Sequence, residues 1–504
     1  MTETVERVLA QFKNESGEIF GSPLDLPINV DSRKLSILFN AIYNSDKESV
    51  PYSFFLEETE IRDSLKKTIE ESADSKNWSS EKIVYITFAP QAVFRVRPVT
   101  RCSASLPGHA EAVISASFSP DGSSLASGSG DTTVRFWDVT TQTPHHTARG
   151  HRNWVLVISW APNGLKLASA CKNGEIIVWE AKSGKQIGST LKGHKQWINA
   201  LSWEPLHRDG DCRRLASASK DATIRIWDTI LGQSLIILCG HSASITCLKW
   251  GGTGLIYSGS QDRTLRVWRD SDGVLCRTLE GHGHWLNTLA LSTDYVMRTG
   301  AFEPAKGVKQ NSIDDLAQVA LERYNKARGE KERLVSGSDD FTLFLWEPED
   351  AKKHVARMTG HQQLINDVKF SPDTRIIASA SFDKSIKLWD GKTGKYITSL
   401  RGHVQAVYQI AWSADTRLLV SGSADSTVKV WDMSTRKLLQ DLPGHADEVC
   451  QLNISFRPEL IVIYLTIFNI PLAGQFSLRF VFRFTPLTGV LMVNLLPAVG
   501  KISS

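Results

Sequence analysis

Short runs in which apolar and polar residues alternate cover most of this chain. In the run that ends at Trp431, the apolar residues Val428 and Val430 alternate with Thr427 and Lys429. Such alternation over four to eight residues is typical of a β-strand with one buried face. Apolar residues recur at helical spacing only near the N-terminus and in one segment after residue 310, and helices are predicted only there. The pattern therefore predicts a mainly β protein.

Glycine-histidine pairs divide most of the chain into repeats. The histidines of these pairs are His109, His151, His194, His241, His282, His361, His403 and His445. Successive histidines lie 42, 43, 47, 41, 79, 42 and 42 residues apart. A period of about 40–45 residues that ends in Trp or Trp-Asp is that of a four-stranded propeller blade. We therefore predict an eight-bladed WD-repeat β-propeller over residues 97–450, with an insertion in the fifth blade.

Three polar positions recur inside the repeats. Seven repeats end in Trp, with Asp or Asn six residues earlier and Ser ten residues earlier. Together with the repeat His they predict hydrogen-bonded tetrads, such as His109, Ser127, Asp131 and Trp137 in the first repeat and His403, Ser421, Asp425 and Trp431 in the seventh. A half-buried polar network is stable only if every member is satisfied. Because the same residues recur seven times, we interpret them as structural, not as catalytic or metal-binding.

Residues 4–96 follow another pattern and are predicted to form a separate α+β domain. The predicted strands cover 6–14, 52–56 and 82–88, and residues 21–27 are predicted to be a turn followed by a second strand. The predicted helices cover 32–44 and 61–73. The first helix is indicated by apolar residues at helical spacing, among them Leu35, Leu38 and Ile42. Two strands, a helix and further strands are the order of a ubiquitin-like roll.

Composition and charge narrow the functional classes. The seven cysteines form no CxxC pair, which favours reduced intracellular thiols over a disulfide framework or a zinc site. The chain has a net charge of +4, but residues 1–96 hold 11 Lys and Arg against 16 Asp and Glu. A mildly basic propeller behind an acidic head suits an RNA-containing environment. With no phosphate-binding loop or nucleophile constellation, we expect a non-enzyme without a cofactor of its own.

Two segments complicate the repeat pattern. The insertion in the fifth blade runs from about Tyr295 to Arg333 and is predicted to contain a helix at about 312–328, with Ser312 as its N-cap. This helix either contacts a partner or packs on its own blade, and both alternatives stay open. Before the first repeat, Val99–Leu106 is expected to complete the last blade as a non-covalent clasp, because closure protects sheet edges.

Candidate binding residues lie at one end of the repeats. Trp154, Trp197 and Trp285 each follow a repeat His by three residues and are expected at the rim of the central channel. There they either serve as exposed binding anchors or pack against neighbouring loops. Lys172 and Lys220 precede the turn Asn or Asp, should face the same end, and could contact phosphate.

Residues 1–450 resemble the Notchless family of ribosome-assembly proteins. The resemblance rests on linkers and on the insertion as well as on the repeats, in segments such as "PQAVFRVRPVTRCSASLPGH", "LSTDYVMRTGAFEP" and "SASFDKSIKLWDGKTGKY". It implies an N-terminal ubiquitin-like (NLE) domain and a scaffold role in the biogenesis of the large (60S) ribosomal subunit. The implied partners are the ATPase midasin and the proteins and rRNA of the pre-60S particle, and the implied location is the nucleolus and nucleoplasm. Such a protein would be a monomer within a large complex, with no membrane partner.

The resemblance also assigns one residue a role. In the family, a glutamate just before the last strand of the head completes the metal coordination of midasin, and the matching residue is Glu81. A hard divalent cation with an open position takes a carboxylate oxygen readily. From the sequence alone, Glu81 is an ordinary solvated residue at the start of a strand.

The C-terminal tail, residues 451–504, departs from the family pattern. It has no acidic residue after Glu459 and no closing Trp. Its uncharged run 460–478 is long enough to span a membrane. However, Asn469, Pro471 and the many β-branched and aromatic residues favour β-strands that do not follow the repeat pattern. We expect this tail to replace most of blade eight, so that the clasp loses its partner and an apolar edge is exposed.

Two other functions are weighed against ribosome assembly. The first is a substrate receptor of a cullin-type ubiquitin ligase, since WD propellers often serve in that role. Such receptors resemble one another in an Arg two positions after the Trp-Asp pair, and this chain has none there. The second is modulation of Notch signalling, which the family name implies.

Overall fold

The computed structural model describes residues 7–14, 19–43, 52–56, 59–61, 64–71, 83–90, 104–303, 313–349, 352–442, 449–454, 463–467 and 477–480. The chain divides into two compact units, Met1–Arg95 and Val96–Ser504. The division lies one residue from the predicted domain boundary.

The first unit is built on a five-stranded mixed sheet with the strand order β2-β1-β5-β3-β4. The strands are β1 (Arg7–Lys13), β2 (Ile19–Pro27), β3 (Tyr52–Leu56), β4 (Thr59–Glu60) and β5 (Val84–Pro90), and the helices are α1 (Ser32–Tyr43) and α2 (Leu65–Glu71). Strands β1 and β5 are parallel, while the other pairs are antiparallel. The predicted strands and helices are confirmed, and β4 is an additional short strand.

Alternation in β1 explains the core of this unit. Val8, Ala10 and Phe12 are buried, while the residues between them are exposed or half-buried. Helix α1 contributes Leu35 and Phe39 to the same core, and the Phe39 ring meets the Phe12 ring edge-on at 5.0 Å between centroids. Aromatic pairs in this geometry add to the gain from area burial alone.

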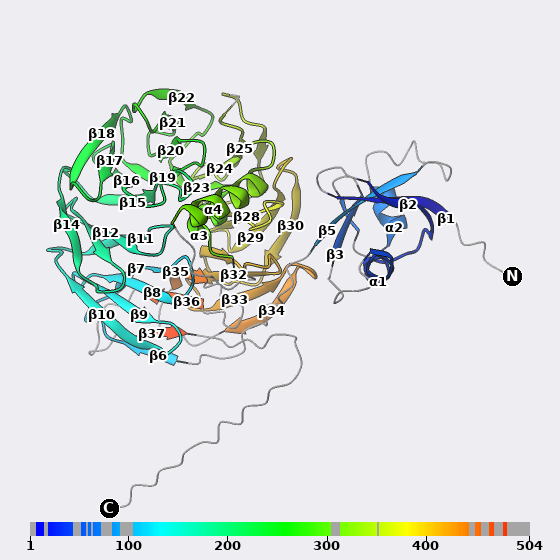
Figure 1. The fold of residues 1–504 in the computed structure, drawn as a ribbon, viewed down its shortest axis with the longest axis horizontal. Coiled ribbons are helices and arrows are strands. Elements are labelled where there is room, and N and C mark those ends of the chain that lie inside the picture. The colour runs from blue at the N-terminus through cyan, green and yellow to red at the C-terminus, as the bar shows by residue number, and fades with distance from the viewer. Residues whose placement is uncertain are drawn as a thin grey trace, which may run out of the picture. The chain divides into compact units, whose positions relative to one another are not determined.

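The second unit is a ring of β-sheets (Figure 1). Seven antiparallel four-stranded sheets form blades one to seven of the described ring. Blades one and two contain β7 (Val113–Phe118), β8 (Ser124–Ser129), β9 (Thr133–Asp138), β10 (Thr143–Arg149), β11 (Val155–Trp160), β12 (Lys166–Cys171), β13 (Ile176–Glu180) and β14 (Gln186–Leu191). Blades three and four contain β15 (Ile198–Trp203), β16 (Arg214–Ser219), β17 (Thr223–Asp228), β18 (Gln233–Cys239), β19 (Ile245–Trp250), β20 (Leu255–Ser260), β21 (Leu265–Arg269) and β22 (Leu275–Leu279).

The remaining regular blades continue the series. Blade five contains β23 (Leu286–Leu291), β24 (Leu334–Ser338), β25 (Leu343–Trp346) and β26 (Ala356–Met358). Blades six and seven contain β27 (Ile365–Phe370), β28 (Ile376–Ser381), β29 (Ser385–Asp390), β30 (Tyr396–Arg401), β31 (Val407–Trp412), β32 (Leu418–Ser423), β33 (Val428–Asp432) and β34 (Lys437–Leu442). The first strand of each blade lies innermost and contacts the first strand of the next blade.

Apolar side chains hold neighbouring blades together. One buried cluster joins Val134 and Phe136 of blade one to Val155 and Trp179 of blade two, and similar clusters occur at the junctions that follow. The second strand of each blade is buried along almost its whole length and carries small residues, as in the "LASGS" of β8. Small side chains are required there because a sheet covers each face of the strand.

The eighth blade corrects one sequence prediction. The tail forms β35 (Val449–Ile454), β36 (Ile463–Ile467) and β37 (Ser477–Phe480), and β35 lies between the inner strands β31 and β7. The clasp strand β6 (Ala104–Pro107) pairs antiparallel with β37, with Leu106 opposite Leu478. The prediction that the clasp loses its partner is therefore wrong. Strand pairing uses backbone groups, so the tail can supply a partner without any of the repeat's marker residues.

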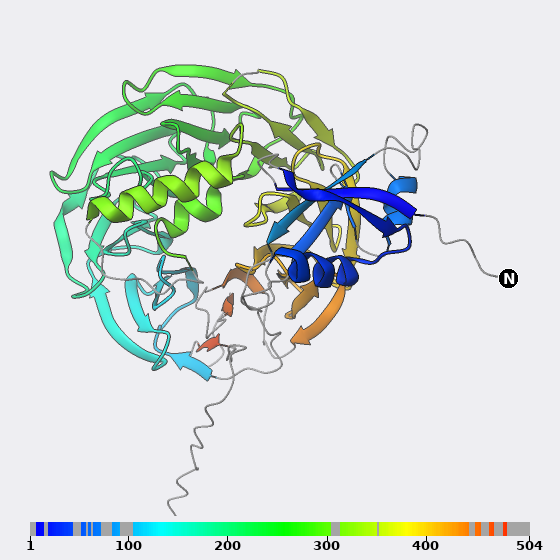
Figure 2. The ribbon, with the colours of Figure 1, turned by 45° about the vertical axis from the view of Figure 1, so that its right-hand side comes forward.

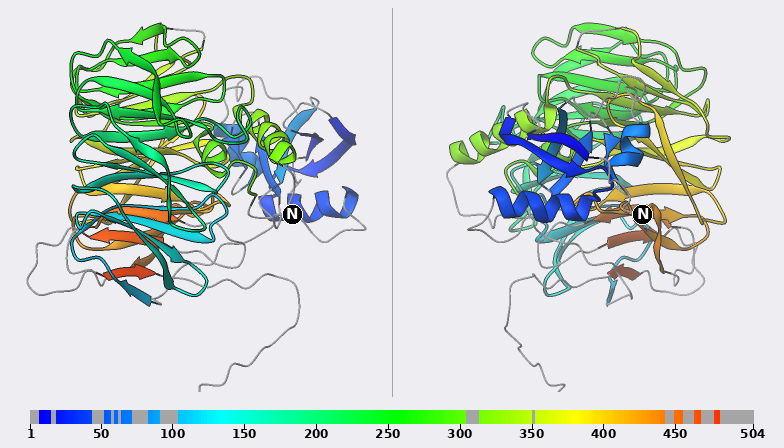
Figure 3. Two further views of the ribbon diagram at one scale, coloured as in Figure 1. Left: turned by 60° about the vertical axis from the view of Figure 1, so that its left-hand side comes forward. Right: turned by 90° about the vertical axis from the view of Figure 1, so that its right-hand side faces the viewer.

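The insertion in blade five forms α3 (Asp294–Thr299), which was not predicted, and α4 (Ile313–Arg328), which lies at the predicted position. Both helices lie on one face of the ring (Figures 2 and 3). Ala320 of α4 is buried in the cluster that contains Leu206 of blade three, and Tyr324 stacks on His207 at 4.6 Å between ring centroids. Helix α4 also contacts its own blade, where Arg328 Nη2 donates to Glu349 Oε2 at 2.7 Å. The alternative of packing on its own blade is therefore confirmed in part, and blade three adds contacts that were not predicted.

A buried carboxylate fixes the insertion to the ring. Glu332 is fully buried and accepts hydrogen bonds from Thr293 Oγ1 at 2.6 Å and Tyr257 Oη at 3.2 Å. Burial raises the pKa of Glu332 above its ordinary value. The two ends of the insertion therefore meet over blade four. Within the described chain, no helix has the length and apolar character needed to cross a membrane.

Candidate functional site

Each regular blade carries a line of hydrogen bonds from its Trp through its Ser to its His. In blade one, the Trp137 indole N–H donates to Ser127 Oγ over 2.8 Å, and Ser127 Oγ lies 2.8 Å from His109 Nε2. His109 Nδ1 lies 2.8 Å from Asp131 Oδ2. An ionised carboxylate can only accept, so the Nδ1–H of His109 donates to Asp131. In the neutral imidazole this tautomer leaves Nε2 to accept the hydrogen of Ser127, whose oxygen accepts the indole N–H of Trp137.

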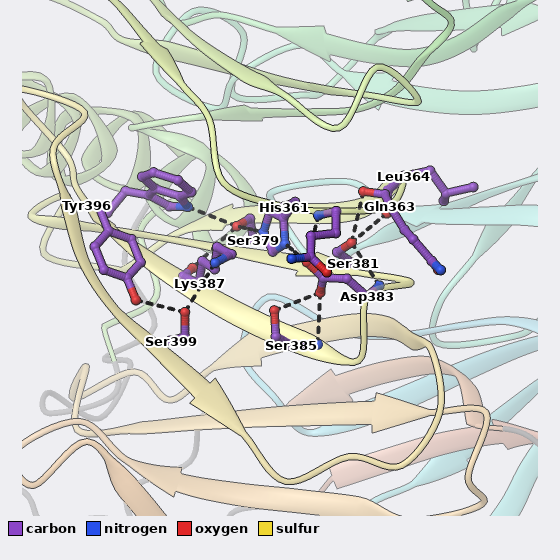
Figure 4. Close-up of polar contacts among 12 residues, drawn as sticks. His361, Gln363, Leu364, Ser379, Ser381, Asp383, Ser385, Lys387, Tyr396 and Ser399 are labelled. Carbon is purple, nitrogen blue, oxygen red and sulfur yellow. Dashed lines mark hydrogen bonds and ion pairs between the residues drawn. The ribbon is translucent and has the colours of Figure 1, made fainter.

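The same contacts recur in the other regular blades. In blade six, His361 lies between Ser379 and Asp383, at 2.7 Å from each (Figure 4). In blade seven, the distances are 2.9 Å from Trp431 Nε1 to Ser421 Oγ, 2.7 Å from Ser421 Oγ to His403 Nε2, and 2.9 Å from His403 Nδ1 to Asp425 Oδ2. The geometry places the sequence-predicted tetrads inside the blades.

The pKa values of the tetrad aspartates indicate the role of the tetrads. Burial by itself raises the pKa of Asp131, but hydrogen bonds from His109 and Thr133 outweigh it and hold this pKa well below the usual range. The same balance lowers the pKa of Asp425 to about 2. Each carboxylate is therefore ionised and fully used by neighbouring donors. A site of this kind fixes loops in place and has no free group with which to attack a substrate.

Blade two is an exception, because Asn173 stands where the other six regular blades have Asp. His151 Nε2 still lies 2.6 Å from Ser169 Oγ, but its Nδ1 has no hydrogen-bond partner in the described part of the chain. Asn173 Oδ1 accepts from Asn153 instead, at 2.8 Å. Burial lowers the pKa of His151 to about 4, although Glu175 opposes the shift. The loops of blade two therefore lack one negative charge and hold a neutral imidazole.

The three predicted rim tryptophans are half-exposed. The exposed fractions are 46% for Trp154, 42% for Trp197 and 46% for Trp285. Each lies immediately before an inner strand. Because β23 begins after Trp285 and ends just before α3, the rim and the insertion helices lie on opposite faces of the ring.

Two lysines lie against these rings. Lys172 Nζ is 5.0 Å from the ring centroid of Trp154 in its own blade and 4.8 Å from that of Trp197 in the next blade. Lys220 Nζ is 4.6 Å from the Trp197 centroid. The backbone supports this arrangement, since the amide of Lys172 donates to the Trp154 carbonyl and that of Lys220 to the Trp197 carbonyl. We call Trp154, Lys172, Trp197 and Lys220 the Trp–Lys rim.

Gly174 allows the two blades to approach so closely. Its φ is +80°, and a Cβ there would lie 2.7 Å from the His194 carbonyl oxygen and 2.8 Å from that of Gln196. A side chain would therefore push the blade-two turn away from the blade-three loop. The left-handed φ alone would not exclude one, because Thr132, Ala222 and Arg263 adopt φ of +64°, +63° and +69° at the same position of other blades. In the other regular blades the corresponding residue is not glycine. Sequence analysis missed Gly174 and Asn173, although both break the repeat pattern in the printed sequence.

The surroundings of Trp285 are different. In place of a Lys, blade five has Asp339, whose amide donates to the Trp285 carbonyl at 2.9 Å. Asp339 Oδ2 lies 3.4 Å from His284 Nδ1, and Oδ1 accepts from Asn287 Nδ2 at 2.5 Å. Four of the five candidate residues thus form the basic Trp–Lys rim, whereas the fifth, Trp285, lies in an acidic environment.

Glu81, the candidate in the N-terminal unit, lies outside the described residues. Over the parts of the chain that are described, no group of three or more His, Cys, Asp or Glu is arranged to hold a metal ion.

Each of the two units matches a known protein family. The NLE (NUC135) domain family matches residues 8–69, and the WD domain, G-beta repeat family matches six segments: 100–138, 142–180, 185–228, 232–269, 352–390 and 394–432. Protein Notchless of Drosophila melanogaster is 54% identical over 378 residues, which are 74% of this chain and 76% of that protein. The chain belongs to the Notchless family.

Further relatives agree with this membership of the Notchless family. The Notchless protein homolog of Arabidopsis thaliana is 51% identical over 78% of this chain and 82% of its own length. Ribosome assembly protein 4 of Saccharomyces cerevisiae is 46% identical over 76% of this chain and 77% of its own length. Among solved structures, the computationally designed Ika8 protein is similar, with a TM-score of 0.58 and 26% identity over 76% of this chain and all of that one.

The repeat matches omit blade five of this Notchless-family chain, although that blade has a complete tetrad. His282 Nδ1 lies 2.9 Å from Asp340 Oδ2, His282 Nε2 lies 2.8 Å from Ser336 Oγ, and Trp346 Nε1 donates to Ser336 Oγ at 2.9 Å. The insertion separates the partners along the chain, but it leaves the blade itself regular. The long distance along the chain between the marker residues of blade five therefore hides a tetrad that is the same as in the other blades.

Proposed function

We propose that this chain is a non-catalytic assembly factor for the large (60S) ribosomal subunit. The observation that carries the proposal is its similarity, over about three quarters of both chains, to a protein named Ribosome assembly protein 4. The architecture supports this role, because an NLE domain and a propeller supply two separate binding units on one chain. The partners would be the proteins and rRNA of the precursor particle, in the nucleolus and nucleoplasm.

In this proposal the N-terminal unit links the particle to the ATPase midasin. Glu81 supplies a carboxylate oxygen to a divalent cation that midasin holds, so the chain needs no cofactor of its own. A hard cation with an open coordination position favours such an oxygen ligand. The propeller holds the chain, as a monomer, on the precursor particle while midasin acts.

The charge of Glu81 provides the test. The variant Glu81→Gln keeps the shape of the side chain but weakens its bond to a cation. Pull-down of midasin by the full chain should therefore fall at least about tenfold, because loss of even an outer-shell partner of a metal ligand typically costs about 10–100-fold. Asp74→Asn removes the same charge from the same domain and serves as the matched control. Equal recovery of midasin with both variants would exclude the role of Glu81.

Sedimentation of cell lysate tests the particle itself. A tag on the full chain should comigrate with the precursor of the large subunit. Its restriction to light fractions would reject ribosome assembly and return attention to Notch signalling or ubiquitin-ligase recruitment. Comigration of Glu81→Gln together with loss of midasin would separate the role of the head from that of the propeller.

A further inference from the structure

The loops around the Trp–Lys rim carry an unusual concentration of positive charge. Segments 149–154, 171–174, 192–197 and 219–222 contain six Lys and Arg residues and one acidic residue, Asp221. Asp221 is already bound to the imidazole of His194, the hydroxyl of Thr223 and the amide of Lys195. Nearby, Glu175 pairs with Lys192 at 3.2 Å. The rim is therefore an electropositive surface whose few acidic groups have partners.

Blade five provides the comparison within the same fold. Its corresponding segments, 280–285 and 338–341, contain Glu280, Asp339 and Asp340 and no Lys or Arg. Trp285 occupies the same position as Trp154 and Trp197 and is equally exposed. Since the backbone frame is shared, the opposite charge reflects the side chains that each sector presents and not the requirements of the blade.

We propose that the Trp–Lys rim binds single-stranded RNA, with unpaired bases stacking on Trp154 and Trp197 and with Lys172 and Lys220 contacting the phosphates. The alternation of aromatic ring and cation across two blades fits this ligand, because single-strand binders combine aromatic faces for bases with a basic track for the backbone. This inference rests on the proposed function only for the source of the RNA, which is the precursor particle.

Relative energies favour a base over the lysine that now covers each ring. Stacking of a base on an aromatic side chain generally contributes more than an exposed cation–π contact does. A base can therefore displace the ammonium group from the ring. The released ammonium group then lies beside the phosphate of the same nucleotide. In the free protein, the contacts at 4.6–5.0 Å hold both side chains close to the positions that binding requires.

Charge alone would also attract an acidic peptide or duplex RNA. Neither ligand uses the exposed ring faces, because a peptide carboxylate has no extended planar face and duplex bases are stacked on one another. The exposure of Trp154 and Trp197 thus favours unpaired bases. The departures from the repeat at Asn173 and Gly174 fit the same ligand. Asn173 removes a negative charge, and Gly174 has no Cβ to collide with the blade-three carbonyls beside the Lys172–Trp197 contact.

The test uses purified full-length chain and a fluorescein-labelled, unstructured twelve-nucleotide RNA, with affinity measured by fluorescence anisotropy. Trp197→Ala should weaken binding about tenfold, within the range for one stacked base. The double variant Lys172→Gln/Lys220→Gln should weaken it at low salt and lower the slope of log K against log salt by about 1.4, or about 0.7 for each lost phosphate contact. Trp285→Ala is the matched control and should change affinity less than twofold.

Three results would overturn the proposal. The first is equal weakening by Trp197→Ala and Trp285→Ala, and the second is RNA binding that none of the rim variants changes. The third is competition by duplex RNA or oligo-aspartate as strong as that by unlabelled single strand, which would indicate a purely electrostatic surface. Thermal melting of every variant shows whether the fold is kept. Because the assay contains no particle and no midasin, its failure would leave the Glu81 and sedimentation tests of the proposed function unaffected.

Discussion

Blades seven and eight are neighbours in the ring but are held together in different ways. Blade seven is one continuous stretch of chain, and its tetrad connects Trp431, Ser421, His403 and Asp425. Blade eight takes three short strands from the C-terminal tail and one, β6, from the start of the unit. Among the described residues, blade eight consists of two strand pairs, β35-β36 and β37-β6. The comparison teaches that strand pairing can close the ring without the tetrad that fixes the loops of blade seven.

Removing the last tail strand should have the largest effect. Deletion of residues 477–504 leaves β6 without a partner and exposes a sheet edge beside blade one, where Leu106 is buried. We expect a loss of at least about 4 kcal/mol in the free energy of unfolding, at the upper end for local changes, together with aggregation.

Thermal melting with light scattering measures this loss. Deletion of residues 481–504 keeps all four strands of blade eight and is the matched control. If the two truncated chains melt at the same temperature, the pairing of β6 with β37 does not contribute to closure.

The tetrad of blade seven should give the next largest effect. Ser421→Ala removes the shared partner of the Trp431 indole and the His403 imidazole, both of which are buried. At about 1–3 kcal/mol for each unsatisfied group, the expected loss is about 4 kcal/mol or somewhat less. Urea unfolding measures it, and Ser434→Ala, on an exposed turn of the same blade, should cost less than about 0.5 kcal/mol.

The smallest effect concerns blade two, whose tetrad is incomplete. The pKa of His151 in the folded chain is about 4, below its ordinary value of 6.5. The neutral imidazole therefore stabilises the fold above about pH 6.5, and this contribution is lost as the pH falls from 6.5 toward 4. Between pH 7 and pH 5 the loss should be about 2 kcal/mol.

Asn173→Asp tests this account of blade two. The new carboxylate can bind His151 as Asp does in the other regular blades, so the pKa of His151 should rise and the acid-dependent loss should shrink. Urea unfolding at the two pH values, with NMR titration of the His151 ring, compares the variant with the unchanged chain. An unchanged pKa would mean that blade two excludes the usual tetrad geometry.

The sequence predicts the repeated parts of this molecule better than its special parts. The ring and its tetrads follow from spacing, because His, Ser, Asp and Trp recur at fixed distances from one another. The contact between Lys172 and Trp197 does not, since it depends on how closely two blades approach at Gly174. Likewise, the apolar positions of α4 predict a helix but do not identify the blades on which Ala320 and Tyr324 pack.

The closure of blade eight was missed for another physical reason. Strand pairing between β6 and β37 depends on backbone groups and on the path of the tail, and neither leaves a residue signature in a segment without Asp or Trp. Glu81 shows the opposite limit. The role proposed for Glu81 follows only from the resemblance to a family, because a carboxylate at the start of a strand has no pattern of its own.

The composite eighth blade also determines how the ring would respond to mechanical load. A pull transmitted from the N-terminal unit would enter the ring through β6, which among the described strands pairs with β37 alone. The four residues of β6 would peel away and release about 13 Å of chain, at about 3.3 Å per residue, before blade one carried the tension. The β6–β37 pair that joins the two ends of the ring would thus separate first under load. The ring would then open while every regular blade stays folded.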